Sequence, residues 1–344
     1  MTTSIKNYNF DLPSDLIAQH PLKNTKDHRM MVVDRKNEKL IHAKVSDFVD
    51  YVCINDCIVV NNTKVVNACL LGQFRTGGDW EGLFLDIANG CWRILLQSKN
   101  EIKPRQTLVL KTNSETFELT LIDRDVDGVW IALPERQANH IEILTKFGNL
   151  PLPPYIREGI SSQEDSLSYQ TFYATCYGAI AAPSAGLHFS QEMMDSIKKK
   201  NISIYELTLH VGLGTYKPIY SEDITKHKIH SEWMQINQET ARQISIAKKR
   251  GKVFAIGTTS LRALETASLG GEIKPYEGYT DLYVKPGFDF VSTDALLTNF
   301  HLPRTTLMVL VKAFAGDELI DLAYKEAIER SYRFCDYGDA MLII

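Results

Sequence analysis

The sequence lacks several features that would assign it to a specialised class of protein. Its 344 residues include only six cysteines and no Cys-x-x-Cys pair, a pattern that favours reduced thiols in a cytosolic protein over a disulfide framework. The polar segment Met1–Asp15 contains no apolar signal core. Apolar runs such as Leu307–Val311 are far too short to span a membrane. We therefore expect a cytoplasmic protein without a membrane partner.

An excess of positive charge is also missing. The formal net charge is -4 at pH 7, so any contact with nucleic acid would depend on a local basic face and not on bulk charge. With 44% hydrophobic and 23% charged residues, the composition is that of an ordinary globular protein with enough apolar material for a core. The chain length favours about two domains.

Common ligand-binding and catalytic motifs are incomplete or missing. His210–Pro218 contains Gly-x-Gly but not the longer dinucleotide fingerprint, and Gly257–Arg262 lacks the lysine and the spacing of a phosphate-binding loop. The Gly-x-Ser-x-Gly motif of serine hydrolases does not occur. His227 and His230 have His-x-x-His spacing, but no obvious third ligand accompanies them, so we expect no metal site.

Alternating strand and helix patterns occupy both ends of the chain. Buried strands are predicted at 29–35 and 57–62, where short apolar runs have charged or turn-forming flanks. Further strands are predicted at 202–209, where the pattern alternates, and at 253–256. Ser190 and Asn237 are predicted N-caps of helices that end near Lys200 and Gly251. Further helices are expected at 261–268, 305–314 and 317–332. This alternation is typical of an α/β domain.

The middle of the chain has a different texture. Between residues 67 and 148, short β-rich stretches are separated by Gly, Asn, Asp and Pro, which predicts a small antiparallel barrel or sandwich. The proline-rich segment Leu150–Tyr155 then forms a stiff connector. We expect a discontinuous α/β main domain, residues 1–66 plus 149–344, with an inserted all-β antiparallel barrel domain at 67–148.

Several segments rich in small and polar residues are candidates for a ligand site. Small side chains permit close approach of a ligand to the backbone, and a strand that meets a helix near Gly257 exposes backbone N–H groups to a polar or anionic ligand. Tightly packed turns would explain the same residues, and these patterns alone name no reaction. The segments are 178–189, 210–218, 257–262, 298–303 and 337–341.

These segments, with others spread along the chain, resemble those of the ribosyltransferase-isomerase family of queuosine synthesis. The matching blocks occur in the same order over almost the whole chain. They are Phe10–Pro13, Ala18–Leu22, Asn61–Lys64, Pro151–Tyr155, Ala182–Phe189, His210–Pro218, His230–Trp233, Gly257–Arg262, Asp294–Pro303 and Tyr337–Met341.

The resemblance implies an activity and its partners. It implies that the enzyme transfers and isomerises the ribosyl moiety of S-adenosylmethionine onto the 7-aminomethyl-7-deazaguanine base in a tRNA anticodon. Epoxyqueuosine-tRNA would form, and adenine and methionine would be released. S-adenosylmethionine would be a consumed co-substrate, and no metal would take part. The resemblance also implies an α/β domain with an inserted barrel.

Two alternatives come from other functional classes. A SAM-dependent RNA methyltransferase would release S-adenosylhomocysteine, but the dinucleotide-type glycine loop of the common methyltransferase fold is missing. A non-catalytic tRNA-binding protein would bind tRNA through the barrel and consume no S-adenosylmethionine.

Candidate site residues follow from the matching blocks. His188, His210 and His301 are candidate bases, because imidazole titrates near neutral pH. Arg262 and Lys217 are candidates for holding the methionyl carboxylate or an RNA phosphate. The other expected substrate-binding residues are Ser184, Gly186, Gly212, Gly214, Thr215, Glu232, Thr258, Thr259, Asn299 and Asp339. We expect His188, His210, Thr258, Arg262 and His301 to converge on one cleft at the carboxyl ends of strands.

The sequence also departs from the family pattern. Cys69 occupies a position where the family usually has arginine, which puts a phosphate or carboxylate contact near the domain junction in doubt. Arg105 stands where a glycine is expected after Lys103-Pro104. Ser184 and Tyr216 are milder changes, and the barrel segment matches the family least well.

Overall fold

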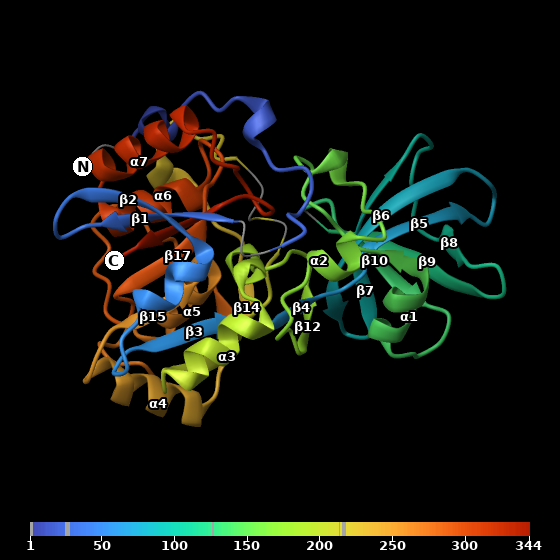
Figure 1. Cartoon of the computed structure of the whole chain (residues 1–344). Helices are drawn as coiled ribbons and strands as arrows, with labels where there is room; N and C mark the ends of the chain where they lie inside the picture. Colours follow the sequence, from blue (N-terminus) through green and yellow to red (C-terminus); the bar gives the residue numbers. More distant parts are fainter. Residues whose placement is uncertain (1–2, 25–27, 126, 213, 215–217) are drawn as a thin grey trace.

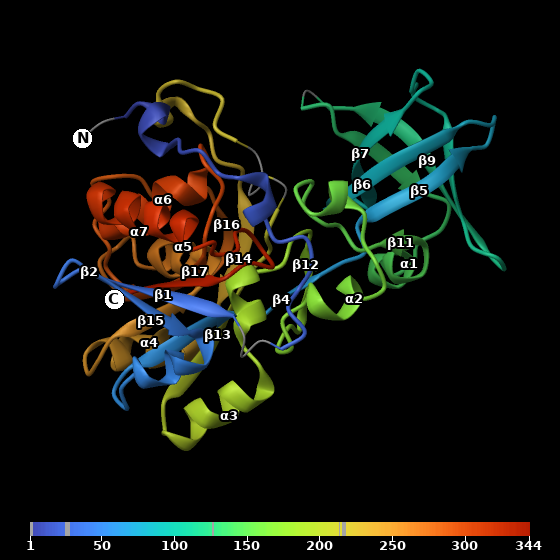
Figure 2. The ribbon, with the colours of Figure 1, turned by 45° about the horizontal axis from the view of Figure 1, so that its top comes forward.

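The structure, a computed structural model, describes residues 3–24, 28–125, 127–212, 214 and 218–344. Two parts are visible, an α/β part that carries both ends of the chain and a barrel to one side (Figure 1). A view turned by 45° shows the same separation (Figure 2). Each part has its own sheet, and the two sheets share no strand.

The α/β part is built on a nine-stranded mixed sheet in the order β16-β14-β13-β3-β15-β17-β18-β1-β2. Its central strands β13, β3, β15 and β17 are parallel to one another. Strands from both ends of the chain alternate in it, so the main domain is discontinuous, as predicted. The strands are β1 (Arg29–Asp34), β2 (Lys39–Lys44), β3 (Cys57–Asn61), β13 (Ser203–Leu209), β14 (Glu232–Ile236), β15 (Val253–Ile256), β16 (Tyr276–Thr280), β17 (Ala295–Asn299) and β18 (Ala340–Ile343).

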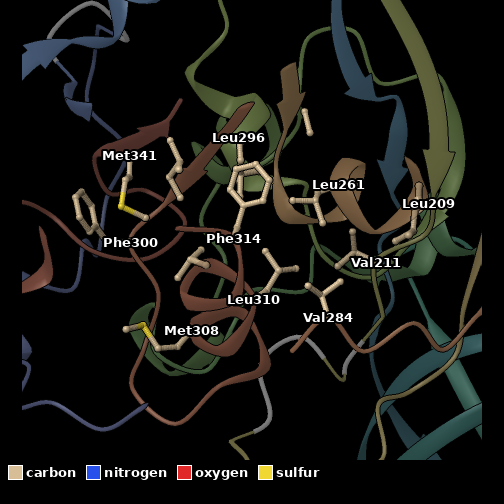
Figure 3. Close-up of a cluster of buried hydrophobic side chains, with 14 of the residues drawn as sticks. Leu209, Val211, Leu261, Val284, Leu296, Phe300, Met308, Leu310, Phe314 and Met341 are labelled. Carbon is tan, nitrogen blue, oxygen red and sulfur yellow. The ribbon is translucent and has the colours of Figure 1, made fainter. Parts of the chain in front are cut away.

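Helices cover both faces of this sheet because its central strands are apolar on both faces. Ile58 and Phe254 pack on one face with α3 (Gln191–Lys199). Their neighbours Val59 and Ala255 pack on the other face with four more helices. These are α4 (Gln238–Lys248), α5 (Thr258–Ala267), α6 (Thr306–Ala315) and α7 (Asp317–Glu329). Figure 3 shows part of that second core, which contains Leu261 of α5, Leu310 of α6 and Leu296 of the sheet.

The sequence patterns predicted most of these helices closely. The side chains of Ser190 and Asn237 accept hydrogen bonds from the first turns of α3 and α4, as expected of N-caps. Two segments treated as loops contain strand residues instead. Thr298 and Asn299 complete β17, and Ala340 begins β18. Both strands are fully buried and only four or five residues long, so they lack the polar-apolar alternation that marks a half-buried strand.

The barrel is a closed antiparallel sheet in the order β5-β6-β7-β10-β9-β8, in which β5 also pairs with β8. Gly72 permits this closure, because a Cβ atom there would lie 2.4 Å from the carbonyl oxygen of Val109. Trp80, Trp92 and Phe117 fill the interior. The strands are β5 (Cys69–Phe74), β6 (Asp79–Ala88), β7 (Cys91–Ser98), β8 (Thr107–Lys111), β9 (Thr116–Arg124) and β10 (Trp130–Pro134). An inserted antiparallel barrel is therefore confirmed.

Short elements connect the two parts. β4 (Thr63–Val65) leads toward the barrel and pairs in parallel with β12 (Cys176–Ala179) after the chain returns. β11 (Gly148–Asn149) pairs with β5, and α1 (His140–Phe147) packs at the barrel. The last short helix is α2 (Asp165–Ser168). In the described part of the chain, we find no helix with both the length and the apolar composition needed to cross a membrane.

Candidate active site at the carboxyl ends of the strands

A cleft opens where the parallel strands end. Residues that directly follow β13, β15 and β17 contribute to its wall, as expected for a ligand site in an α/β sheet. The cleft has a volume of about 630 Å³, counting the part that is open to solvent. Its lining consists of Tyr155, Ala182, Pro183, Ser184, Ala185, Val211, Gly257, Thr258, Thr259, Thr298, Asn299, Phe300, His301, Leu302, Thr305, Leu307, Cys335 and Asp336.

The N-terminus of α5 lies in this wall. Gly257 adopts a φ of 90°, a conformation that glycine accepts more readily than other residues, and it turns the chain from β15 directly into the helix. Gly257 is the N-cap residue and has no side chain with which to cap the helix, so the first backbone N–H groups of α5 can serve a polar ligand. Thr258 and Thr259 therefore lie where the sequence predicted them.

His301 follows β17 and lines the cleft. Its Nε2 atom is 2.8 Å from Thr298 Oγ1. Its backbone N–H donates to Tyr324 Oη at 2.9 Å, which fixes the loop. Burial lowers the pKa of His301 to about 3, so the imidazole is uncharged at neutral pH and one ring nitrogen can accept a hydrogen bond, whereas protonation of the ring is disfavoured.

Asn299 is the last residue of β17, and its amide is held in one orientation. Nδ2 donates to the carbonyl oxygens of Cys335 at 3.0 Å and Asp336 at 3.4 Å, and it lies 3.2 Å from His188 Nε2. These three acceptors fix Nδ2, so Oδ1 points away from them. Oδ1 is buried and has no hydrogen-bond partner among the described residues, so the cleft wall contains an unused acceptor.

His188 lies behind the wall and does not line the cleft. Its side chain is buried against the ring of His28, with a centroid distance of 4.8 Å. Burial, followed by the nearby His28 and Arg333, lowers the pKa of His188 well below its usual value. Nε2 accepts from Asn299. The geometry gives His188 contact with a cleft residue but not with the cleft itself.

His210 also lies outside the cleft, at the end of β13. Its ring stacks on Trp233 at 5.0 Å, and Nδ1 is 2.8 Å from Thr63 Oγ1. Gly178 packs against the other edge of the ring, where a Cβ atom would lie 2.5 Å from Nε2. Burial lowers the pKa of His210 to about 4.

A second, smaller hollow of about 390 Å³ adjoins the cleft. Leu307 in the first turn of α6 lines both, so the two hollows are neighbours at this side chain. Within the second hollow, Arg262 Nη1 is paired with Glu232, and Nε donates to the carbonyl oxygen of Leu282 at 3.1 Å. Nη2 of Arg262 is buried and has no hydrogen-bond partner among the described residues.

Glu232 in turn is fixed by the glycine loop. The backbone N–H of Gly212 donates to Glu232 Oε1 at 2.8 Å. Gly214 lines the second hollow and packs closely against His230. Glu232, Arg262 and Gly214 therefore share one site, whereas Thr215 and Lys217 lie outside the described residues.

The remaining candidates have different surroundings. Ser184 lines the cleft. Gly186 is a packing position, since a Cβ atom there would lie 2.2 Å from Tyr173 Oη. Asp339 is buried, is ion-paired with Arg29 and accepts from the backbone N–H of Arg333 at 2.9 Å. Asp339 therefore ties β1 to the C-terminal segment and lines neither hollow.

The expected convergence of five residues is thus only partly found. Thr258 and His301 line the cleft, Arg262 lines the adjoining hollow, and His188 and His210 line neither. Sequence reasoning also missed several lining residues. Leu307 resembles an ordinary core residue of a helix, whereas Asp336, which precedes the Tyr337–Met341 block, and Tyr155, in the proline-rich block, lay within reach of the motif analysis.

Metal binding has no geometric support in the part of the chain that the structure describes. No group of three or more His, Cys, Asp or Glu side chains there has an arrangement that could hold a metal ion.

The chain is thus an α/β protein with an inserted antiparallel barrel and a candidate ligand site at the ends of its parallel strands. Comparison with known proteins identifies the family. The sequence profile described as "queuosine biosynthesis protein" matches residues 5–343. The chain belongs to this family, and it is an enzyme.

Relatives cover the chain almost completely. The S-adenosylmethionine:tRNA ribosyltransferase-isomerase of Natranaerobius thermophilus is 42% identical over 98% of this chain and 99% of its own length. The enzyme of the same name from Prochlorococcus marinus is 44% identical over 98% and 96%. A crystal structure of S-adenosylmethionine tRNA ribosyltransferase from Thermotoga maritima has a TM-score of 0.57 and 31% identity, covering 98% of this chain and 100% of that one.

Proposed function

We propose that this protein transfers and isomerises the ribosyl moiety of S-adenosylmethionine onto the 7-aminomethyl-7-deazaguanine base of a tRNA anticodon. The products are epoxyqueuosine-tRNA, adenine and methionine. The observation that carries the proposal is the near-complete coverage of ribosyltransferase-isomerases at 40% identity or more. The cleft adds physical support, because it combines apolar walls with a few polar groups, as small-molecule sites commonly do.

The chemistry needs a base and a shielded pocket. The sulfonium of S-adenosylmethionine acidifies the adjacent C5′ hydrogens, so a modest base can remove one of them. Adenine then leaves, the aminomethyl group attacks the ribosyl carbon skeleton, and closure of the epoxide expels methionine. The sulfonium provides the driving force, so we propose that neither a metal nor ATP is required.

His301 is the base that the geometry favours. Of the three candidate histidines, it is the one that lines the cleft. Burial lowers its pKa to about 3, which makes it a weak base, so the proposal depends on the sulfonium to acidify the C5′ hydrogen. His188 is a positioning residue in this proposal, since it contacts Asn299. His210, stacked on Trp233, supports the end of β13.

One assay separates this proposal from its alternatives. The protein is incubated with S-adenosylmethionine and tRNA that carries the aminomethyl base, and the small products are separated chromatographically. We expect adenine and methionine. S-adenosylhomocysteine would identify a methyltransferase, and unconsumed S-adenosylmethionine with bound tRNA would identify a binding protein.

The domain bounds and the location are part of the proposal. We place the α/β catalytic domain at residues 1–66 plus 149–344, the inserted barrel domain at 67–148, and the enzyme in the cytoplasm, where tRNA is modified. All six barrel strands lie within 67–148, which supports the bounds. A chain in which a short linker joins residue 66 to residue 149 should fold and bind S-adenosylmethionine. Loss of folding would contradict the bounds.

A further inference from the structure

We propose that the two hollows divide the co-substrate between them: the adenine base lies in the cleft with its exocyclic amino group on Asn299 Oδ1, and the amino-acid carboxylate lies in the second hollow on Arg262 Nη2. This inference rests on the proposed function, because it assumes that S-adenosylmethionine is the ligand. Its ribosyl group and sulfonium would then lie near Leu307, the side chain that lines both hollows.

The first half of the assignment comes from Asn299. Its side chain is 2% exposed, and three acceptors hold its Nδ2, so only the Oδ1 acceptor remains for a ligand. An unpaired buried acceptor costs free energy until it meets a donor. Adenine presents such a donor in its N6 amino group, whereas hypoxanthine presents an oxygen at the same place.

The walls around Asn299 favour a neutral ring over an ammonium group. Ala182, Pro183, Ala185, Val211 and Leu302 give the cleft apolar surfaces on which a flat base can pack. An ammonium group there would lose hydration, and the carboxylate in the lining, Asp336, already accepts a hydrogen bond from Tyr169 Oη at 2.6 Å.

The second half comes from Arg262. It is 6% exposed, Nη1 and Nε are already bound, and Nη2 alone has no partner among the described residues. Guanidinium groups bind carboxylates through short charge-assisted hydrogen bonds. Glu232, next to Arg262, supplies the negative charge that an α-ammonium group needs. A guanidinium donor beside a carboxylate therefore matches the carboxylate and the ammonium group of an amino acid.

Matched ligands test the two halves separately by calorimetry. 5′-Methylthioadenosine and 5′-methylthioinosine differ at the position opposite Asn299. S-adenosylhomocysteine and 5′-methylthioadenosine differ by the amino-acid portion. We expect the native protein to prefer the adenine ligand about tenfold over the hypoxanthine ligand, the size of one buried hydrogen bond. We expect a preference of about tenfold or more for S-adenosylhomocysteine over 5′-methylthioadenosine.

Two variants should separate these preferences. Asn299→Ala should abolish the adenine preference and keep the amino-acid preference. Arg262→Lys should reduce the amino-acid preference and keep the adenine preference, while the lysine still neutralises Glu232. If Arg262→Lys does not fold, the double variant Glu232→Gln/Arg262→Gln removes both charges together and replaces it.

Controls are available in the same α/β part. Asn237 is the N-cap of α4, where its amide oxygen accepts from the backbone N–H of Thr240 at 2.8 Å, and it lines neither hollow. Arg35 is a half-buried arginine that also lines neither hollow. Asn237→Ala and Arg35→Lys should lower stability and leave both preferences unchanged.

The outcomes are decisive. If Asn299→Ala removes the amino-acid preference and Arg262→Lys removes the adenine preference, the co-substrate lies in the reverse direction and the proposal is overturned. It is also overturned if neither preference changes while adenine is still released from S-adenosylmethionine, and the proposed function then stands. If the native protein binds none of these ligands and releases no adenine, both proposals fail.

Discussion

The barrel and the α/β part bring residues together in opposite ways. In the barrel, four of the seven strand pairs join consecutive strands, all of the barrel strands come from one stretch of the chain, and the core is a continuous apolar interior. In the α/β part, the cleft combines residues from positions as distant as Tyr155 and Asp336. The family blocks cluster in the α/β part, and the barrel matches the family pattern least well.

This difference predicts which part of the molecule tolerates amino-acid substitutions and which part does not. A barrel whose residues serve packing accepts many apolar sequences of suitable volume. The proposed ligand site, which needs one acceptor at Asn299 in the cleft and one donor at Arg262 in the adjoining hollow, accepts few substitutions. We therefore expect substitutions in the cleft to change the reaction, and substitutions in the barrel to change stability or tRNA affinity.

The largest effect should come from the proposed base. His301→Ala should lower the rate of adenine release by about 10² to 10⁴-fold, the usual contribution of a general base. The rate is measured per folded enzyme, alongside thermal unfolding. His140→Ala is the matched change in the barrel and should leave this rate unchanged. Full turnover by folded His301→Ala protein would remove it from the catalytic residues.

His188→Ala distinguishes a base from a positioning residue. Loss of its contact with Asn299 should lower thermal stability and weaken the adenine preference, and the remaining turnover should keep the pH profile of the native enzyme. A changed pH profile would return His188 to the list of candidate bases.

Acid should destabilise the α/β part through its buried histidines. The pKa of His210 falls from 6.5 to about 4, and that of His301 to about 3, because of burial. Below pH 6.5 the unfolded chain binds these protons first, so the free energy of unfolding falls as pH drops from 6.5 toward 4 and is fully restored above 6.5. Each histidine contributes about 1.4 kcal/mol per pH unit in this window.

Denaturant unfolding at several pH values measures this dependence. His210→Gln should reduce the slope by the share of one histidine. A slope unchanged by that substitution would show that His210 is not held in its neutral form.

A smaller effect is expected where the barrel closes. Gly72→Ala places a Cβ atom 2.4 Å from the carbonyl oxygen of Val109 and 2.5 Å from Trp80. Such overpacking typically costs about 1–3 kcal/mol. Gly270→Ala, which meets only the distant end of Lys274 at 3.8 Å, is the control. Equal unfolding free energies of the two variants would contradict the close approach of β5 and β8.

The smallest effect should be a gain in stability. Arg105 stands where the family has glycine, and its φ is 70°, in the left-handed region. Arg105→Gly should relieve strain and raise the free energy of unfolding by about 1 kcal/mol or less, since glycine also gains freedom in the unfolded chain. Chemical denaturation measures the change, and a clear loss of stability would show that the arginine side chain stabilises the barrel.

The architecture was largely predictable from the sequence, because caps such as Asn237 and apolar strands such as Val253–Ile256 have strong local signals. The site was less predictable. The motifs placed Thr258, Asn299 and His301 near the strand ends, where the structure has them. His188 is separated from the cleft by the side chain of Asn299, and the spacing of residues in the sequence does not reveal such a separation. Leu307 was missed because its apolar side chain looks the same in a core and in a cleft wall.

Cys69, the other departure from the family pattern, lies at the start of β5. Its thiol is partly buried, and burial, followed by the nearby Glu81, raises its pKa to about 11. The thiol is therefore uncharged at neutral pH, whereas an arginine at this position would place a positive charge near Glu81.

Isotope transfer tests the central claim most directly. The enzyme is given aminomethyl-bearing tRNA with S-adenosylmethionine labelled either in the ribose or in the methyl group, and label in the tRNA is counted. Ribosyl transfer predicts that the ribose label enters the tRNA while the methyl label leaves with methionine. Methyl label in the tRNA, or no label from either substrate, would contradict the account.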